Sequence, residues 1–239
     1  MKRASNRLRG QTLGVAVLLA AVASASADDR DPTPADLVAD LGHPDYAVRQ
    51  AATDALLIDP SLTPDELAAL APPDAGPEVR HRLLGVARHH FLRRLRLETF
   101  PADGPASLGV VQSAQNPTPT DQPDTPAYVL VTRVLPGFPA TGRLRPFDRV
   151  LALDGRPLLP DQNFPELMRR YRAGQQVVVT VERADQTLDL AVPLANKAAL
   201  VEMYAQPGHG LTPVFGRRWE HVLRTTLAPL SSSPDTPSP

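Results

Sequence analysis

The sequence lacks cysteine altogether and is poor in aromatic residues, which make up 5% of its 239 positions. The absence of cysteine excludes disulfides, thiolate metal ligands, cysteine nucleophiles and the lipid-modified cysteine of a lipoprotein. The sequence also lacks an excess of charge of one sign, because its 25 Lys and Arg residues nearly balance its 26 Asp and Glu residues. A protein built to coat nucleic acid is therefore excluded. The apolar content of 42% suffices for one or two domains with packed cores.

The N-terminus has the order of segments found in a secretory signal peptide. Four basic residues stand among the first nine, ten small and apolar residues follow at Leu13–Val22, and Ala25–Ala27 precedes two aspartates. The apolar run is too short to span a hydrocarbon layer of about 30 Å comfortably. We therefore predict cleavage after Ala27, export to the periplasm or beyond, and no membrane span in the mature chain. Retention of the segment as an anchor is the alternative.

Residues 28–98 carry the start signals of helices joined by short turns. Thr33 and Thr63 each precede a proline, Asp45 can cap a further helix, and Pro77 opens a longer one. Each start is followed by apolar residues at helical spacing. This pattern predicts four helices, arranged as two helical hairpins.

Two short motifs recur within this helical region. Val48-Arg49 and Val79-Arg80 stand 31 residues apart, each behind a proline-containing turn. On these turns and this spacing, the segment Pro34–Leu95 resembles HEAT repeats. Two units are fewer than usually stack stably, so we expect the region to be stabilised by packing against a neighbouring domain.

The long fourth helix carries six arginines and three histidines. We interpret the arginines as a solvated face, although a basic stripe can also bind phosphates or an anionic membrane surface. His81 and His89 are eight residues apart, not the four of a helical metal pair, and no carboxylate completes the set. We therefore predict no metal site and no cofactor, and no nucleic-acid partner.

The hydrophobic pattern changes from helical to alternating after Phe100, which indicates strands. Between the last strands, Phe164, Leu167, Met168 and Tyr171 have the spacing of one helix face. Together these patterns predict a small barrel-like sheet with two helices. The five predicted strands are Leu108–Gln112, Tyr128–Val134, Arg149–Leu153, Val177–Val181 and Leu188–Val192.

Four stretches occur in a characteristic order: Ser107–Val110, Val134–Ala140, Leu144–Gly155 and Ala173–Gln175. On these motifs and their spacing, residues 106–195 resemble the PDZ domain of exported bacterial proteins. The expected fold class is thus α+β, with HEAT-like helical hairpins followed by a PDZ-like small β-barrel. The predicted division of the chain is a signal peptide (1–27), a helical region (28–98), a PDZ domain (99–195), a C-terminal helical extension (196–227) and a disordered Ser/Pro-rich tail (228–239).

The PDZ resemblance implies a peptide-binding groove. In that family a tight turn receives the terminal carboxylate of a peptide on its backbone N–H groups, the following strand pairs with the peptide, and a helix forms the opposite wall. The chain departs from the family at Ser107 and Phe147, where glycine is common, and has no Lys or Arg between Thr99 and Ser107. The residues so implied are Leu108, Gly109 and Val110 in the turn, Val111 and Gln112 in the strand, and Asn163 with either Leu167 or Met168 on the helix, with Arg170 at a further groove position.

These observations predict a non-catalytic exported adaptor that binds an extended or C-terminal peptide segment by strand addition. Outside the PDZ-like part the sequence has no Gly-x-Ser-x-Gly, His-Glu-x-x-His or Ser/Lys arrangement, so we do not expect an enzyme. Two alternatives stay open. One is a structural scaffold, in which Leu108 and Val110 are simply core residues and residues 99–105 or 196–207 fill the groove. The other is a regulatory subunit or remnant of a PDZ-bearing protease. The partner and the oligomeric state are left open by the sequence.

Overall fold

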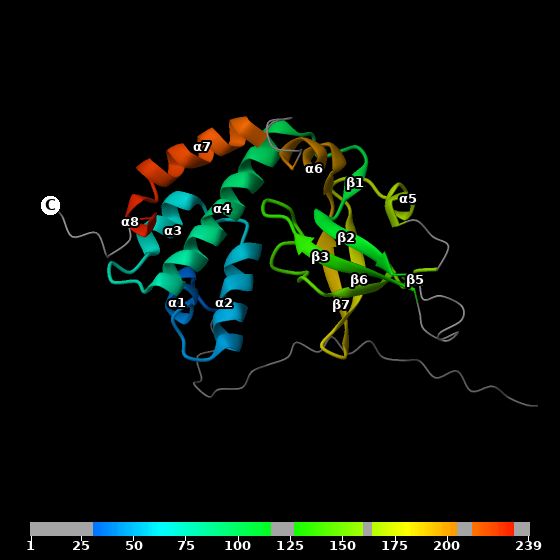
Figure 1. Cartoon of the computed structure of the whole chain (residues 1–239), viewed down its shortest axis with the longest axis horizontal. Coiled ribbons are helices and arrows are strands. Elements are labelled where there is room, and N and C mark those ends of the chain that lie inside the picture. The colour runs from blue at the N-terminus through cyan, green and yellow to red at the C-terminus, as the bar shows by residue number, and fades with distance from the viewer. Residues whose placement is uncertain (1–30, 116–126, 160–163, 205–211, 232–239) are drawn as a thin grey trace, which may run out of the picture. The chain divides into compact units, whose positions relative to one another are not determined.

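The computed structural model describes residues 31–115, 127–159, 164–204 and 212–231 (Figure 1). The predicted signal peptide and Asn163 lie outside these residues. Within them, no helix is both long and apolar enough to cross a membrane.

The four helices predicted for the N-terminal region are confirmed: α1 (Pro34–Asp40), α2 (Tyr46–Ile58), α3 (Pro64–Leu70) and α4 (Pro77–Thr99). Capping explains where they begin. The side chains of Thr33 and Thr63 each accept a hydrogen bond from the third helical N–H, and an acidic residue reaches back to the cap. The Asp45 carboxylate accepts from the N–H of Ala47. The resemblance of these helices to HEAT repeats stays a prediction.

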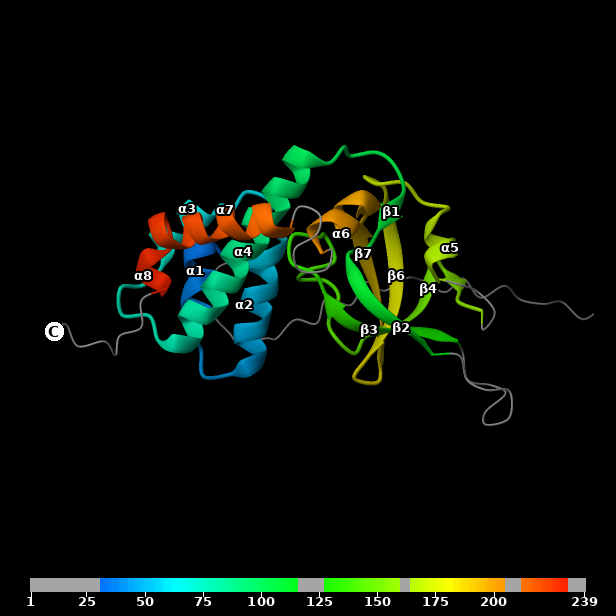
Figure 2. The same ribbon diagram turned by 45° about the horizontal axis from the view of Figure 1, so that its top comes forward.

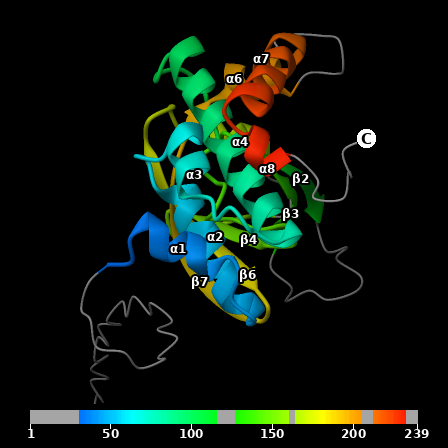
Figure 3. The ribbon, with the colours of Figure 1, turned by 90° about the vertical axis from the view of Figure 1, so that its left-hand side faces the viewer.

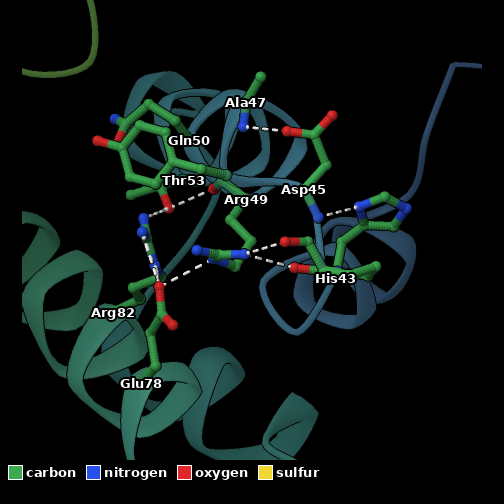
Figure 4. A network of polar contacts seen from close by, with 10 residues as sticks. His43, Asp45, Ala47, Arg49, Gln50, Thr53, Glu78 and Arg82 are labelled. Atoms are coloured by element: carbon green, nitrogen blue, oxygen red, sulfur yellow. Dashed lines mark hydrogen bonds and ion pairs between the residues drawn. The ribbon is translucent and has the colours of Figure 1, made fainter.

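Arginine side chains tie α2 and its preceding turn to α4 (Figure 4). Oε1 of Glu78 accepts from Arg49 Nε at 2.9 Å and from Arg82 Nη2 at 2.9 Å. Arg49 also donates to the carbonyl of His43 at 2.8 Å, and Arg82 to the hydroxyl of Thr53 at 3.0 Å. The hydrogen bond from Arg82 is the main cause that holds the pKa of the Glu78 carboxyl below its usual value. The arginine of the first Val-Arg motif therefore joins the two helices.

Two C-terminal helices, α7 (Thr212–Thr225) and α8 (Ala228–Ser231), complete the core of the helical region. The ring of Trp219 lies 5.3 Å from that of Phe91 on α4, and α8 packs next to α4 (Figure 3). Leu227 and Leu230 are buried in the same cluster as Leu56 and Leu83. The prediction of a disordered tail is therefore wrong for Ala228–Ser231, because burial of Leu230 stabilises a short helix there.

The five predicted strands are present, although the first begins at Val110 and not at Leu108, and they form one antiparallel sheet in the order β2-β3-β4-β6-β7, with β5 pairing to β4. A separate ribbon joins β1 and β8. In β6 the alternate residues Val177, Val179 and Val181 are fully buried, which explains the alternating pattern of the sequence. The strands are β1 (Ala106–Ser107), β2 (Val110–Gln115), β3 (Tyr128–Val134), β4 (Arg149–Leu153), β5 (Arg156–Pro157), β6 (Gln176–Arg183), β7 (Gln186–Pro193) and β8 (Ala195–Asn196).

Two helices accompany the sheet. The predicted helix over Phe164–Tyr171 is shorter than expected, because α5 spans only Phe164–Met168 and then tightens, with the N–H of Tyr171 donating to the carbonyl of Met168. After the last strand, α6 (Lys197–Met203) begins at the cap residue Asn196.

Helix α4 also contacts the sheet region, through the turn Pro136–Phe138 that follows β3. The N–H of Gly137 donates to Nδ1 of His89 at 3.0 Å, and its carbonyl accepts from Nε of Arg96 at 2.8 Å. Arg96 is buried, and its guanidinium lies over the Phe138 ring. The interpretation of the arginines as a solvated face is therefore wrong for Arg96, because this turn offers it a buried carbonyl and an aromatic face.

Candidate peptide-binding groove

The outer edge of β2 is open to another strand. Among the described residues β2 pairs only with β3, as the end strand of the sheet (Figure 2). Gln112 stands opposite Val131, whose N–H and C=O both bond on the far side, to Asp148 and Phe147. In an antiparallel pair of this kind both residues direct their backbone groups away from each other. The N–H and C=O of Gln112 therefore point toward the open edge.

The turn before β2 is fixed from behind by Phe138. Gly109 has a φ of +75°, and a Cβ at this position would overlap the Phe138 side chain. Its carbonyl accepts from the N–H of Leu135 at 3.0 Å. This bond flanks the pair Val110–Val134, so the N–H and C=O of Val110 also face the open edge. Two alternate residues of β2, Val110 and Gln112, thus present backbone N–H and C=O groups that pair with no strand among the described residues.

A cavity of about 740 Å³ lies along this edge, between β2 and α5. Its apolar lining includes Leu108, Val110, Leu135, Phe164 and Met168. Such a groove offers both a strand edge and a place for an apolar side chain, which is the combination that strand addition requires.

The sheet, the turn and the groove agree with the family comparison. Residues 106–194 match a family model described as PDZ domain. Residues 106–194 are a PDZ domain. The predicted resemblance is confirmed for this part of the chain.

Solved structures that resemble the chain include two of an HtrA-type protease. One, HtrA-type protease AlgW with decapeptide, is 26% identical over 38% of this chain and 29% of that chain, with a TM-score of 0.30. The other, a variant of AlgW with decapeptide, is 22% identical over 44% of this chain and 32% of that chain, with a TM-score of 0.33. The chain thus spans less than a third of the first and about a third of the second. No curated protein matches the chain.

The structure brings most of the predicted site residues together. Leu108, Val110, Val111, Gln112 and Met168 all line the cavity of the PDZ domain. Gly109 lies in the turn behind this lining, and Asn163 lies outside the described residues.

Of the two alternatives on the helix, Met168 lines the groove and Leu167 does not, and the groove position predicted for Arg170 is wrong. Leu167 is buried in the sheet core and borders a different cavity, and Arg170 borders that same cavity. Phe164 and Met168 line the groove instead, together with Arg169. Helical spacing identified the buried residues of α5 but could not distinguish those facing the core from those facing the groove, because adjacent residues differ by only about 100° around the helix axis.

The N–H groups of the PDZ turn are not all free. The N–H of Gly109 donates to the hydroxyl of Ser107 at 3.1 Å, and Ser107 is itself buried. The serine that replaces the common glycine therefore provides an internal acceptor where the family receives a carboxylate. An incoming carboxylate would compete with this hydroxyl.

Sequence reasoning missed the positive charge of the groove. Four basic residues line it, and the described lining contains no acidic residue. Arg172 forms a backbone bridge with Pro105, and the N–H of Lys197 donates to the carbonyl of Pro105, so both lie at the end of the groove that holds the turn. The segment 99–107 itself has no Lys or Arg, whereas pairing of β1 with β8 brings in residues from ninety positions further along.

Helix α6 forms the remaining wall at this end. Leu200 and Tyr204 line the groove, and the Tyr204 hydroxyl donates to the carbonyl of Pro136. Burial raises the pKa of Tyr204 to about 12, so its ring stays neutral at physiological pH. Tyr204 therefore contributes an uncharged wall, and the charge of the groove comes from its arginines and lysine.

Proposed function

We propose that this protein is an exported, non-catalytic adaptor whose PDZ domain binds the extended C-terminal segment of another protein by strand addition to β2. The observation that carries the proposal is the juxtaposition of the open edge at Val110 and Gln112 with a large, partly apolar cavity. The signal-peptide pattern of residues 1–27 supports export.

Binding is expected to be weak and reversible. A short peptide added to one edge gains a few main-chain hydrogen bonds and one buried apolar side chain. Such contacts typically give a Kd near the micromolar range, or about −8 kcal/mol. The Ser107 hydroxyl on the N–H of Gly109 reduces what a carboxylate can gain there.

The test is titration of the chain from residue 28 onward with fluorescent peptides that end in a free or an amidated carboxylate. We expect the free carboxylate to bind more tightly. Absence of binding by both sets would favour the scaffold alternative, in which the groove holds no ligand.

A pair of variants at Gln112 locates the binding edge. Gln112→Pro removes an N–H that faces the groove, and proline is tolerated on an edge strand. Loss of one main-chain hydrogen bond, worth about 0.5–1.5 kcal/mol, weakens binding by roughly two- to tenfold. Gln112→Ala keeps the N–H and should bind within about twofold of the wild type.

The non-catalytic part of the proposal has its own test. The purified chain should leave casein intact under conditions that suit serine and metal-dependent proteases. Cleavage that specific inhibitors abolish would contradict it and favour a protease.

A further inference from the structure

We propose that the groove selects C-terminal segments with an acidic residue immediately before an apolar last residue, and that Arg133 binds the acidic side chain. This inference rests on the proposed function and names the class of peptide bound.

The basic residues of the groove are available to a ligand. No ion pair or side-chain hydrogen bond to another described residue is found for Arg133, Arg169, Arg172 or Lys197. Other arginines of the PDZ domain are occupied: Arg149 pairs with Glu182. Unneutralised positive charge along a cavity attracts a ligand of opposite charge.

A second cavity of the same domain differs in this respect. It is bordered by Arg156 and Arg170, but the carboxylate of Asp154 lies on the same lining. Among the described residues, positive charge without a counter-charge therefore characterises the peptide groove and not every cavity of the domain.

The register of β2 shows which of its side chains face the sheet core and which face the opposite, outer side. Val110 is partly buried and packs against the sheet core, on the side of Met168. The next residue, Val111, has 38% of its surface exposed and stands opposite Arg133 on β3. Paired residues of neighbouring strands place their side chains on the same face. Val111 and Arg133 therefore share the outer face.

A peptide paired antiparallel to β2 extends this register. With its carboxylate at the Leu108–Val110 turn, its last residue lies beside Val110 and its penultimate residue beside Val111. The last side chain then faces the apolar cavity, and the penultimate side chain shares the outer face with Arg133. An acidic penultimate side chain is thus the complement of Arg133.

Two of the other basic residues act on every C-terminus alike. Arg172 and Lys197 lie at the turn end of the groove, where they attract any free carboxylate. Their charge raises affinity for all C-termini and does not distinguish one penultimate residue from another. Because Arg133 stands opposite Val111 and so shares the face of the penultimate side chain, it is the residue on which the preference depends.

The experiment uses the chain from residue 28 onward and three peptides that differ only before the last residue, ending in Glu-Val, Gln-Val or Lys-Val with free carboxylates. Because Arg133 is exposed, each step in charge should change Kd by about two- to fivefold, with Glu-Val tightest and Lys-Val weakest. The preference should shrink at about 0.5 M salt, where screening is strong.

Variants assign the preference to one side chain. Arg133→Glu should reverse the order of the three peptides, and Arg133→Gln should abolish it. The matched control is Arg156→Glu, which makes the same charge change on the same domain at an exposed residue outside the groove. It should keep the wild-type order.

The outcomes separate this inference from the proposed function. Equal affinity of the wild type for all three peptides would overturn the acidic preference and leave peptide binding intact. A reversed order in Arg156→Glu would overturn the role of Arg133 and indicate a general effect of net charge. If none of the three peptides binds, the proposed function fails, and the inference fails with it.

Discussion

Two turns of the PDZ domain each contain a residue in the left-handed region, and they accommodate it differently. Gly137, with a φ of +85°, is buried against helix α4. Phe147, with a φ of +74°, has 78% of its surface exposed. One position is filled by the residue that adopts this conformation without strain, and the other by a bulky aromatic residue.

The surroundings explain the difference. At Gly137 a Cβ would lie 2.7 Å from Cβ of Leu92 and 3.0 Å from its carbonyl carbon, so packing against α4 excludes any side chain. The Phe147 side chain extends into solvent, while its N–H bonds to Val131 and the next residue, Asp148, is buried in an ion pair with Arg183. Packing thus requires glycine at position 137. At position 147 the hydrogen bond to Val131 and the ion pair of Asp148 hold the backbone in place, and the side chain makes no difference to them.

The strongest test of this contrast is Gly137→Ala. The left-handed φ costs an alanine about 1–2 kcal/mol, and overlap with Leu92 adds roughly 1–3 kcal/mol. We expect the free energy of unfolding, measured by urea denaturation, to fall by roughly 2–5 kcal/mol.

Gly155→Ala is the matched control, because Gly155 has a φ of +71° but no atom near the position of a Cβ. It should lose only the conformational part, about 1–2 kcal/mol. Equal losses of unfolding free energy in the two variants would show that α4 leaves room for a Cβ at position 137.

The Gly137 turn should also be sensitive to pH, through His89. Burial lowers the pKa of His89 to about 3, because the charged ring would lose its hydration, and Nδ1 accepts a hydrogen bond from Gly137. The unfolded chain binds the proton near its ordinary pKa of about 6.5, so stability is full above that pH and falls as pH decreases toward 3. At pH 5 the loss from this group is about 2 kcal/mol.

Urea denaturation at about pH 7.5 and about pH 5 measures this loss. His89→Asn retains an acceptor for Gly137 and cannot be protonated, so its loss of stability between the two pH values should be about 2 kcal/mol smaller than in the wild type. The control His81→Asn changes an exposed histidine of the same helix and should leave the wild-type loss in place. An unchanged pH dependence in His89→Asn would mean that the ring is protonated in the folded state.

For α4 the sequence predicted the helix but not its long-range contacts. The helix itself was predictable, since Pro77 and the apolar spacing after it are local signals. The burial of Arg96 was not, because the carbonyl that accepts its hydrogen bond belongs to Gly137, forty-one positions away. Leu230 was missed for the same reason, as its partners lie on the N-terminal helices.

The residues of the groove likewise divide into those that local sequence patterns predicted and those that they did not. The strand edge from Leu108 to Gln112 was predicted, because alternation marks the strand and the resemblance marks the turn. Leu167 was misplaced, since periodicity does not tell which buried face of a short helix meets a ligand. Lys197 was not foreseen, because only the pairing of β1 with β8 carries it to the turn.

The smallest expected effect concerns the exposed turn. Phe147→Gly removes the left-handed strain of about 1–2 kcal/mol, but glycine adds freedom to the unfolded chain, which offsets roughly 0.5–1 kcal/mol. We expect a net gain of about 0.5–1 kcal/mol in the free energy of unfolding. Phe147→Ala is the control, because it deletes the ring but keeps the Cβ that causes the strain. A gain of the same size in both variants would assign the effect to the exposed ring and not to the backbone, and the contrast between the two turns would then be one of hydrophobic exposure.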